Sequence, residues 1–290
     1  MAIPKVATIH DLSGLGKCSL TAAIPILAVC GVQAVPMPTA VLSNQTAFES
    51  YTGADLSIYM PMIAEEWKKR KVAFQGIFTG YLSSEKEVEW VEEFIDEFRR
   101  EDTLILVDPV LGDEGKFYRG FGDEMCCAMQ NLCRKADVIT PNLTEALFLL
   151  GKDATMAEQG ERLAVVEQYA RELSKLGPQT VIITGIHQGD RIWNVGFDAQ
   201  ENNCFSISTK KIGEGYSGTG DILSSVVCGC MVRGESAEQA LKKAAKLLEI
   251  SIAEAVEDQT DPNEGIAFEH HLELLMDNVS GGDYHEITNA

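Results

Sequence analysis

The stretch Gly215-Tyr216-Ser217-Gly218-Thr219-Gly220-Asp221 indicates how the chain is organised. It follows a strand-like run at 204–209 and leads into 222–231, where apolar residues recur at helical spacing. The first turn of a helix has unpaired N–H groups at the positive end of the helix dipole, and glycines let an anion approach them closely. The stretch therefore predicts a phosphate-binding turn. A carboxylate there repels a phosphate unless it faces another group, such as a hydroxyl proton.

The same glycines fit two other interpretations, of which the first is discounted. Gly213, Gly215 and Gly218 match the spacing of a dinucleotide-binding fingerprint, and Glu238 stands where its ribose-binding acid is expected. The match falls late in the chain, however, and Glu238 lies inside a predicted helix at 237–248 instead of at the end of a second strand. The simpler alternative is a tight turn in which Asp221 only favours the helix dipole.

Composition limits the classes of protein to consider. The chain has 290 residues, of which 45% are hydrophobic and 23% charged, as in ordinary globular proteins. Its formal net charge of −20 argues against nucleic acid or an anionic membrane as partner, because both need a basic surface. A polyanionic substrate would need a metal ion and main-chain dipoles to be tolerated.

The cysteines and the N-terminus indicate a cytoplasmic protein. The eight cysteines contain no C-x-x-C pair, and Cys126–Cys127 and Cys228/Cys230 are too close for ordinary disulfides or a zinc knuckle. They are expected to be free thiols in a reducing compartment. The sequence shows no signal peptide and no apolar run near the ~18 residues of a membrane span.

Strand and helix patterns alternate along the chain. Strands are expected at 5–9, 32–35, 73–79, 103–107, 138–140 and 180–184, with a hairpin of 191–197 and 204–209. Helices are expected at 20–29, 57–70, 84–100, 125–133, 142–150, 164–176, 237–255 and 266–276, and loops at 10–17, 39–50 and 110–120, the last a flexible flap. This order predicts an α/β fold in one domain, 1–290, with a mostly parallel sheet covered by helices on both faces and a frayed tail from about 280.

Ligands of such sheets bind beyond the carboxyl ends of the strands. Six residues follow or end strands on that side: Asp11, Thr46, Tyr81, Asp108, Thr140 and Thr184. The segment Gly14-Leu15-Gly16-Lys17-Cys18 resembles part of a P-loop. Asp11 stands at the position of its first glycine, however, and Cys18 at that of its Ser or Thr, so no phosphate site is expected there.

Five short motifs occur in a familiar order: Ser43-Asn44-Gln45-Thr46, Gly80-Tyr81-Leu82, Asp108-Pro109-Val110-Leu111-Gly112-Asp113, Thr140-Pro141-Asn142-Leu143-Thr144-Glu145 and Gly218-Thr219-Gly220-Asp221. Through them, the chain from about 6 to 234 resembles the pyridoxal kinases of the ribokinase-like superfamily. The resemblance implies a three-layer α/β sandwich with a central, mostly parallel sheet, usually as a homodimer. It also implies ATP-dependent phosphorylation of the 5′-hydroxymethyl group of pyridoxal, pyridoxamine or pyridoxine, for vitamin B6 salvage to pyridoxal 5′-phosphate.

The resemblance also implies roles for single residues. Asp221 is the expected general base, and Gly218, Thr219 and Gly220 form an anion hole for the γ-phosphate. Asn142 and Glu145 match an N-x-x-E motif that organises Mg²⁺, and a monovalent cation such as K⁺ is a further candidate. The remaining implied contacts are Asp108 and Asp113 beside metal and phosphates, Tyr118 in the flap, Thr140, Thr184 and Thr219 at the nucleotide phosphates, and Thr46 and Tyr81 around the pyridine ring.

One position departs from the pattern. Family members commonly carry Gln-Ser-His where this chain has His10-Asp11-Leu12. A carboxylate beside a pyridine nitrogen would favour the protonated ring through a charge-assisted hydrogen bond, so ring specificity stays open.

Several alternatives to this reading remain. They include a hydroxymethylpyrimidine kinase, which typically has cysteine in place of Asp221, a sugar kinase with a longer lid, and a non-catalytic vitamer-binding protein. Asn142 and Glu145 also fit a helix cap, and Tyr81 also fits core packing.

Overall fold

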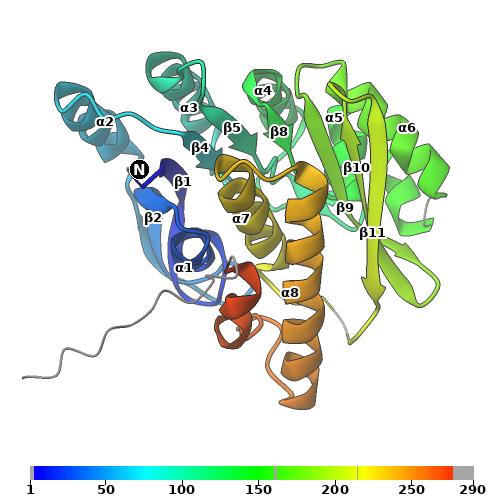
Figure 1. The fold of residues 1–290 in the computed structure, drawn as a ribbon. Helices are drawn as coiled ribbons and strands as arrows, with labels where there is room; N and C mark the ends of the chain where they lie inside the picture. The colour runs from blue at the N-terminus through cyan, green and yellow to red at the C-terminus, as the bar shows by residue number, and fades with distance from the viewer. Residues whose placement is uncertain (1–2, 160–161, 214, 277–290) are drawn as a thin grey trace, which may run out of the picture.

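A computed structural model describes residues 3–159, 162–213 and 215–276. A nine-stranded sheet forms its centre (Figure 1), in the order β11-β10-β9-β8-β5-β4-β1-β2-β3. Its strands are β1 (Lys5–Leu15), β2 (Gln33–Asn44), β3 (Gly53–Asp55), β4 (Gly76–Thr79), β5 (Leu104–Val107), β8 (Val138–Ile139), β9 (Thr180–Gln188), β10 (Arg191–Asp198) and β11 (Asn203–Lys210). The neighbouring strands β2, β1, β4, β5, β8 and β9 all pair in parallel. At the two ends of the sheet, β3 pairs antiparallel with β2, β10 with β9, and β11 with β10. A small hairpin joins β6 (Gly112–Asp113) to β7 (Lys116–Phe117).

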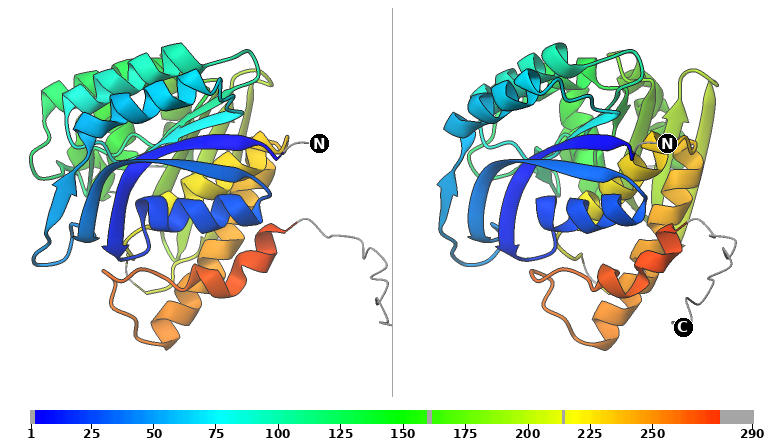
Figure 2. Two further views of the ribbon diagram at one scale, coloured as in Figure 1. Left: turned by 90° about the vertical axis from the view of Figure 1, so that its left-hand side faces the viewer. Right: turned by 60° about the vertical axis from the view of Figure 1, so that its left-hand side comes forward.

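Helices cover both faces of the sheet (Figure 2). One face packs against α2 (Met60–Lys69), α3 (Glu85–Phe98), α4 (Asp123–Lys135), α5 (Leu143–Leu149) and α6 (Leu163–Ser174). The other packs against α1 (Ser19–Val29), α7 (Thr219–Val232), α8 (Ala237–Glu257) and the 3₁₀ helix η3 (Phe268–Leu275). Two further 3₁₀ helices are η1 (Ser57–Tyr59) and η2 (Ala154–Gln159). The predicted three-layer α/β fold is confirmed.

The sequence explains these elements locally. β4 and β5 are short apolar runs buried in the middle of the sheet, as parallel strands covered on both faces must be. In α3, apolar residues face the core, and the Ser84 hydroxyl caps the helix by accepting the Glu87 N–H. The reciprocal bond of a capping box does not form, because the Glu87 carboxylate instead accepts the N–H of Ser83 at 2.6 Å and its hydroxyl at 3.0 Å.

Two segments were expected to be loops, but 10–17 is strand as far as Leu15 and 39–50 is strand as far as Asn44, so the predictions were wrong for those residues. β1 continues to Leu15 after a register shift between His10 and Leu12, and β2 continues to Asn44 beside it. Leu15 is 50% exposed and Val41 41% exposed, so these extensions bury little apolar surface and show no core pattern in the sequence. Main-chain pairing is their main stabilising interaction.

The order of the strands determines where a ligand can bind. The chain runs outward from β1 to β2 and then returns through α2 to β4, on the other side of β1. In open α/β sheets, the carboxyl edge beside such a reversal is the usual ligand crevice. β1, β4 and β5 all deliver polar residues to this edge, which makes it the place to look for a site.

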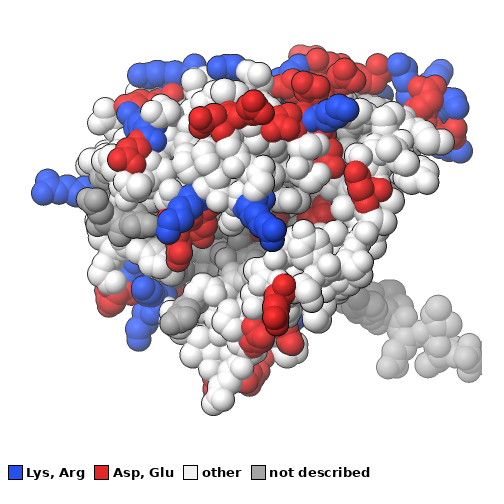
Figure 3. Space-filling view, turned by 180° about the vertical axis from the view of Figure 1, so that it is seen from behind, with Lys and Arg blue, Asp and Glu red and all other residues white. Residues whose placement is uncertain are grey.

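Other expectations concern the C-terminal region and the surface. The predicted helix at 266–276 is the 3₁₀ helix η3, kinked at His271, and the tail expected to fray from about 280 lies outside the described residues. The eight cysteines all lie in the described residues, and none of them forms a disulfide there. On the face in Figure 3, basic side chains stand in small separate groups among acidic ones.

In the part of the chain that the structure describes, no helix combines the length and the apolar character needed to cross a membrane.

Candidate active site

The glycine-rich turn begins α7 as predicted. Gly218 is the N-cap residue and has a φ of +82°, and a Cβ on it would lie 1.9 Å from the Lys17 carbonyl oxygen, so only glycine fits. A Cβ on Gly220 would meet no atom within 4 Å, which leaves open space beside the first turn. The Thr219 hydroxyl donates to the Tyr216 carbonyl at 3.1 Å and closes the turn. The first-turn amides of α7 therefore lie where an anion can approach them.

Asp221 stands in the same turn and faces the carboxyl edge of the sheet. A Cβ on Gly80, just after β4, would lie 3.8 Å from the Asp221 Oδ1 atom. The Ser19 main-chain N–H donates to Asp221 and opposes the upward shift of its pKa. Burial, followed by the charges of Asp108 and Asp11, raises the pKa of Asp221 to about 8. A carboxyl with a pKa near neutrality suits proton transfer better than an ordinary one.

Asp108 lies at the end of β5 and is linked to α7. Its Oδ2 atom accepts the Ser224 hydroxyl at 2.9 Å, and the Ser224 and Thr140 hydroxyls are 2.9 Å apart. All three side chains are buried. Burial raises the pKa of Asp108 to about 7, and the Ser224 hydrogen bond opposes this shift. These three hydrogen-bonded side chains connect the end of β5, the end of β8 and α7.

Glu145 is fixed by three main-chain and side-chain contacts at the start of α5. The Asn142 side chain accepts the Glu145 N–H at 2.9 Å, and the Glu145 carboxylate accepts the Asn142 N–H at 2.8 Å, which confirms the capping interpretation. The other carboxylate oxygen accepts the Leu111 N–H at 3.1 Å. Burial and then the charge of Asp108 raise the pKa of Glu145 well above its ordinary value.

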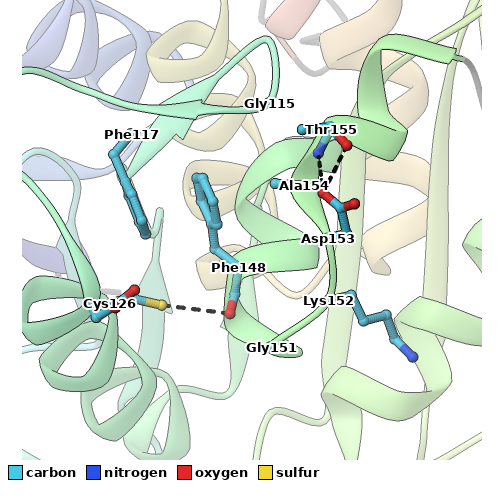
Figure 4. A pocket seen from close by; sticks show the side chains of 10 residues that line it. Gly115, Phe117, Cys126, Phe148, Gly151, Lys152, Asp153, Ala154 and Thr155 are labelled. Carbon is cyan, nitrogen blue, oxygen red and sulfur yellow. Dashed lines mark hydrogen bonds between the residues drawn. The ribbon is translucent and has the colours of Figure 1, made fainter.

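The predicted flap is the β6–β7 hairpin, and α5 holds it in place. The Asn142 amide donates to the Gly112 carbonyl at 2.8 Å, and the Gly115 N–H donates to the Thr144 hydroxyl at 3.0 Å. Phe117 of the hairpin stacks on Phe148 of α5, with ring centres 3.8 Å apart and an interplanar angle of 8° (Figure 4). The flap therefore moves with α5 unless these contacts break.

A cavity of about 390 Å³ lies beneath the hairpin, between it, α4 and the segment 151–155 (Figure 4). Phe117, Cys126 and Phe148 line it, and none of the predicted catalytic residues does. Cys126 Sγ lies 3.5 Å from the Phe148 carbonyl oxygen, so the thiol is already used in packing. This cavity is separate from the carboxylate cluster at the edge of the sheet.

The hairpin also carries Asp113 and Tyr118. Asp113 is exposed, and Tyr118 is 44% exposed. Partial loss of solvent around its hydroxyl, and then the charge of Glu145, raises the pKa of Tyr118 although much of the side chain is exposed. Both residues lie in the flap as predicted.

Asp11 is buried in β1 and held by two serines that the sequence analysis did not identify. Its Oδ2 atom accepts the Ser13 hydroxyl at 2.7 Å, and its Oδ1 atom accepts the Ser19 hydroxyl at 2.6 Å. Ser19 has a φ of +47°, which is rare for a residue other than glycine and typical of functional sites. Ser19 thus bonds to Asp11 through its hydroxyl and to Asp221 through its N–H.

His10 lies beneath this group. It is fully buried, and neither ring nitrogen has a hydrogen-bond partner among the described residues. Burial lowers the pKa of His10 to about 3, so its ring is neutral, and it packs edge-on against Phe78 at 4.4 Å between ring centres.

The remaining predicted contacts are spread along the edge of the sheet. Tyr81 is partly exposed and stacks on Phe121, with ring centres 5.8 Å apart. Thr46 is exposed in the turn that follows β2. Thr184 lies in β9, and its N–H donates to the Pro141 carbonyl at 2.9 Å. Since β8, β5 and β4 separate β9 from β1, Thr184 and Asp11 mark opposite ends of the candidate site.

The site is acidic, and this bears on Mg²⁺. In the described part of the chain, no lysine or arginine contributes to the pKa shifts of Asp108, Glu145 or Asp221. Nor does any group of three His, Cys, Asp or Glu residues within that part have the geometry to hold a metal ion alone. Mg²⁺ usually binds through one or two carboxylates together with substrate phosphates. Asp108 and Glu145, buried and without a cation, fit that kind of binding.

The fold is that of a known kinase family. The sequence model of the family described as phosphomethylpyrimidine kinase matches residues 20–266. The chain belongs to this family. The likeness to pyridoxal kinases is confirmed as well, because proteins similar to this chain include enzymes of that name.

Three relatives illustrate the likeness. A Bacteroides thetaiotaomicron protein, described provisionally as a phosphomethylpyrimidine kinase, is 39% identical with a TM-score of 0.92 over 97% of both chains. Its orthorhombic crystal form contains pyridoxal and is 40% identical over 94% of this chain and 96% of that one, with a TM-score of 0.90. Pyridoxal kinase from Lactobacillus plantarum is 28% identical over 94% and 97% of the chains, with a TM-score of 0.85. Pyridoxal kinase from Dictyostelium discoideum is 28% identical over 79% of each chain.

Proposed function

We propose that this kinase transfers the γ-phosphoryl group of ATP to the 5′-hydroxymethyl group of a B6 vitamer, with Asp221 as the general base. The observation that carries the proposal is the first turn of α7, where open main-chain amides and a carboxylate of raised pKa stand side by side. Acceptance of a proton and stabilisation of phosphate charge are the two tasks of phosphoryl transfer to an alcohol.

The residues divide the reaction between them. The vitamer hydroxyl loses its proton to the Asp221 carboxylate while its oxygen forms a bond to the γ-phosphorus, and the bond from that phosphorus to the bridging oxygen breaks to leave ADP. The amides of Thr219 and Gly220 face the oxygens that gain charge. Thr140, just after β8, and Thr184, in β9, contact the nucleotide phosphates. The flap, with Asp113 and Tyr118, covers these phosphates.

Asp108 and Glu145 would hold Mg²⁺ against the phosphates. When bound there, Mg²⁺ supplies positive charge that offsets the phosphates and favours the ionised carboxylates. The chain's own contribution is to keep both carboxylates in fixed positions, Asp108 through Ser224 and Glu145 through the Asn142 and Leu111 amides.

The vitamer ring lies at the β1–β4 end of the edge. Asp11 stands there with its two oxygens each accepting one serine hydroxyl, which leaves lone pairs for a protonated ring nitrogen. Tyr81 and Thr46 approach from the segments after β4 and β2. The pyridoxal in the 40% identical Bacteroides structure supports a B6 ring as the substrate.

A second candidate is a hydroxymethylpyrimidine substrate. The family description and that given to the Bacteroides protein both favour it. Against it stands Asp221, because the resemblance leads us to expect cysteine at this position in hydroxymethylpyrimidine kinases.

One assay decides between them. ATP consumption is measured with pyridoxal, pyridoxamine, pyridoxine and hydroxymethylpyrimidine, and the products are identified by mass. We expect kcat/KM to be highest for a B6 vitamer. A preference for the pyrimidine would replace the first candidate by the second, and ATP consumption with neither would favour a vitamer-binding protein without catalysis.

A further inference from the structure

Gln45 belongs to the Ser43-Asn44-Gln45-Thr46 motif but has no role in the mechanism so far. It follows β2 and is 7% exposed. Its side-chain nitrogen donates to the Ser217 hydroxyl and to the Asn263 carbonyl, both at 3.1 Å. Its side-chain oxygen accepts the Ala47 N–H at 2.7 Å. Every polar atom of this buried carboxamide is therefore used, and its partners come from segments far apart in the chain.

These contacts reach the phosphate-binding turn. Ser217 is the residue before Gly218, and its N–H donates to the Pro262 carbonyl at 3.0 Å. The turn is therefore held on one side by Gln45 and the segment 262–263, and on the other by Lys17, whose carbonyl leaves no room for a side chain on Gly218.

Gln45 is itself fixed on both sides. Its own N–H donates to the Leu15 carbonyl at the end of β1 at 2.9 Å. A Cβ on Gly16 would lie 2.8 Å from the Gln45 Cγ atom, so the side chain has little freedom to move. A rigid carboxamide transmits its own position to the groups that it bonds.

We propose that Gln45 is a positioning residue for phosphoryl transfer, a proposal that rests on the function proposed above. Its carboxamide sets the position of Ser217, and through it the amides that follow Gly218 at the start of α7. The next residue, Thr46, belongs to the vitamer side of the site. One side chain thus fixes the distance between the segment that faces the vitamer and the turn that faces the γ-phosphate.

The test compares Gln45→Leu with a matched control, Gln239→Leu. Gln239 also uses its side-chain oxygen in main-chain hydrogen bonding, in the capping box of α8, where it bonds to Ser236 and to no residue of the proposed site. We expect Gln45→Leu to lower kcat about 10- to 100-fold with KM for ATP changed less than about threefold, because a shift of about 1 Å in a catalytic group has that effect. Gln239→Leu lowers Tm and leaves kcat unchanged. Equal Tm losses with equal kcat in the two variants would overturn the proposal.

Hydrogen exchange gives a readout independent of activity. Gln45→Leu is expected to speed exchange at the amides of Ser217 and Ile222, which donate to the Pro262 and Gly218 carbonyls, and Gln239→Leu is not. If Gln45→Leu does not fold, Ser217→Ala removes one of the same bonds and is expected to change exchange and kcat in the same direction, by smaller factors. Unchanged exchange in the turn would refute the positioning role. If the wild type phosphorylates none of the four substrates, the proposed function fails, while the exchange data still decide whether Gln45 fixes the turn.

Discussion

Replacing Asp221 by asparagine separates the chemistry of this carboxylate from its effect on the fold. Asparagine keeps the shape of the side chain and can still accept the Ser19 N–H, but it cannot take a proton from an alcohol. A positioned base contributes about 10²–10⁴-fold, so turnover is expected to fall at least about 100-fold, with nucleotide affinity retained.

The same substitution is expected to stabilise the folded protein. Burial and neighbouring carboxylates raise the pKa of Asp221 from 3.8 to about 8, so between these values the native state binds more protons than the unfolded state. The free energy of unfolding therefore falls as the pH rises through this range. The full shift corresponds to an upper limit of about 6 kcal/mol, and relaxation with partial exposure leaves about 1–3 kcal/mol. For a chain of this size, that raises Tm by about 2–6 °C.

The assay measures thermal unfolding of both proteins between about pH 5 and pH 8, without Mg²⁺ or nucleotide, alongside turnover at saturating ATP. The stability advantage of the variant should grow with pH. Asp102→Asn, at an exposed turn position, is the control and should change neither quantity. A variant that turns over like the parent would remove Asp221 from the mechanism. One whose stability advantage is the same at every pH would refute the electrostatic account of the site.

Three further predictions address the rest of the site. The kcat/KM for the vitamer should fall as the pH is lowered, with an apparent pKa well above 3.8, because the base must be ionised; a flat profile down to about pH 5 would contradict this. Glu145→Gln should raise the Mg²⁺ concentration needed for half-maximal activity, and an unchanged Mg²⁺ titration would limit Glu145 to capping α5 and holding the flap. Gly218→Ala should destabilise the fold, whereas Gly220→Ala should fold with nearly parental Tm yet lose activity, since its added methyl group would enter open space beside the amides; equal Tm losses in the two variants would show that Gly220 is structural.

The sequence predicted the parts of the molecule that local patterns determine. The strand and helix order, the glycine turn before α7 and the cap formed by Asn142 and Glu145 all follow from spacing within a few residues. The extensions of β1 and β2 did not, because a strand pair stabilised mainly by its main chain has no hydrophobic pattern.

The hydrogen-bond network of the site was also beyond local patterns. Ser224 is 116 residues from Asp108, and Ser19, which bonds to Asp11, adopts a left-handed conformation that serine seldom takes. A serine near a helix start usually indicates a cap, so nothing in the sequence distinguishes Ser19 or Ser224 from ordinary helix residues. Gln45 was predictable only in part: the sequence showed the motif to which it belongs, but not its hydrogen bond to Ser217, 172 residues away.

The raised pKa values also suggest how a chain of net charge −20 would accept the polyphosphate of the proposed reaction. With pKa values of about 7 and about 8, Asp108 and Asp221 are partly protonated at neutral pH in the free protein. The site therefore carries less negative charge before the nucleotide binds than its count of carboxyl groups suggests. In the proposed mechanism, positive charge that enters with the phosphates would favour ionisation, so Asp221 would become able to accept a proton when the γ-phosphorus is present. Burial of these carboxyls without a lysine or arginine partner would then link the ionisation of Asp221 to occupation of the site.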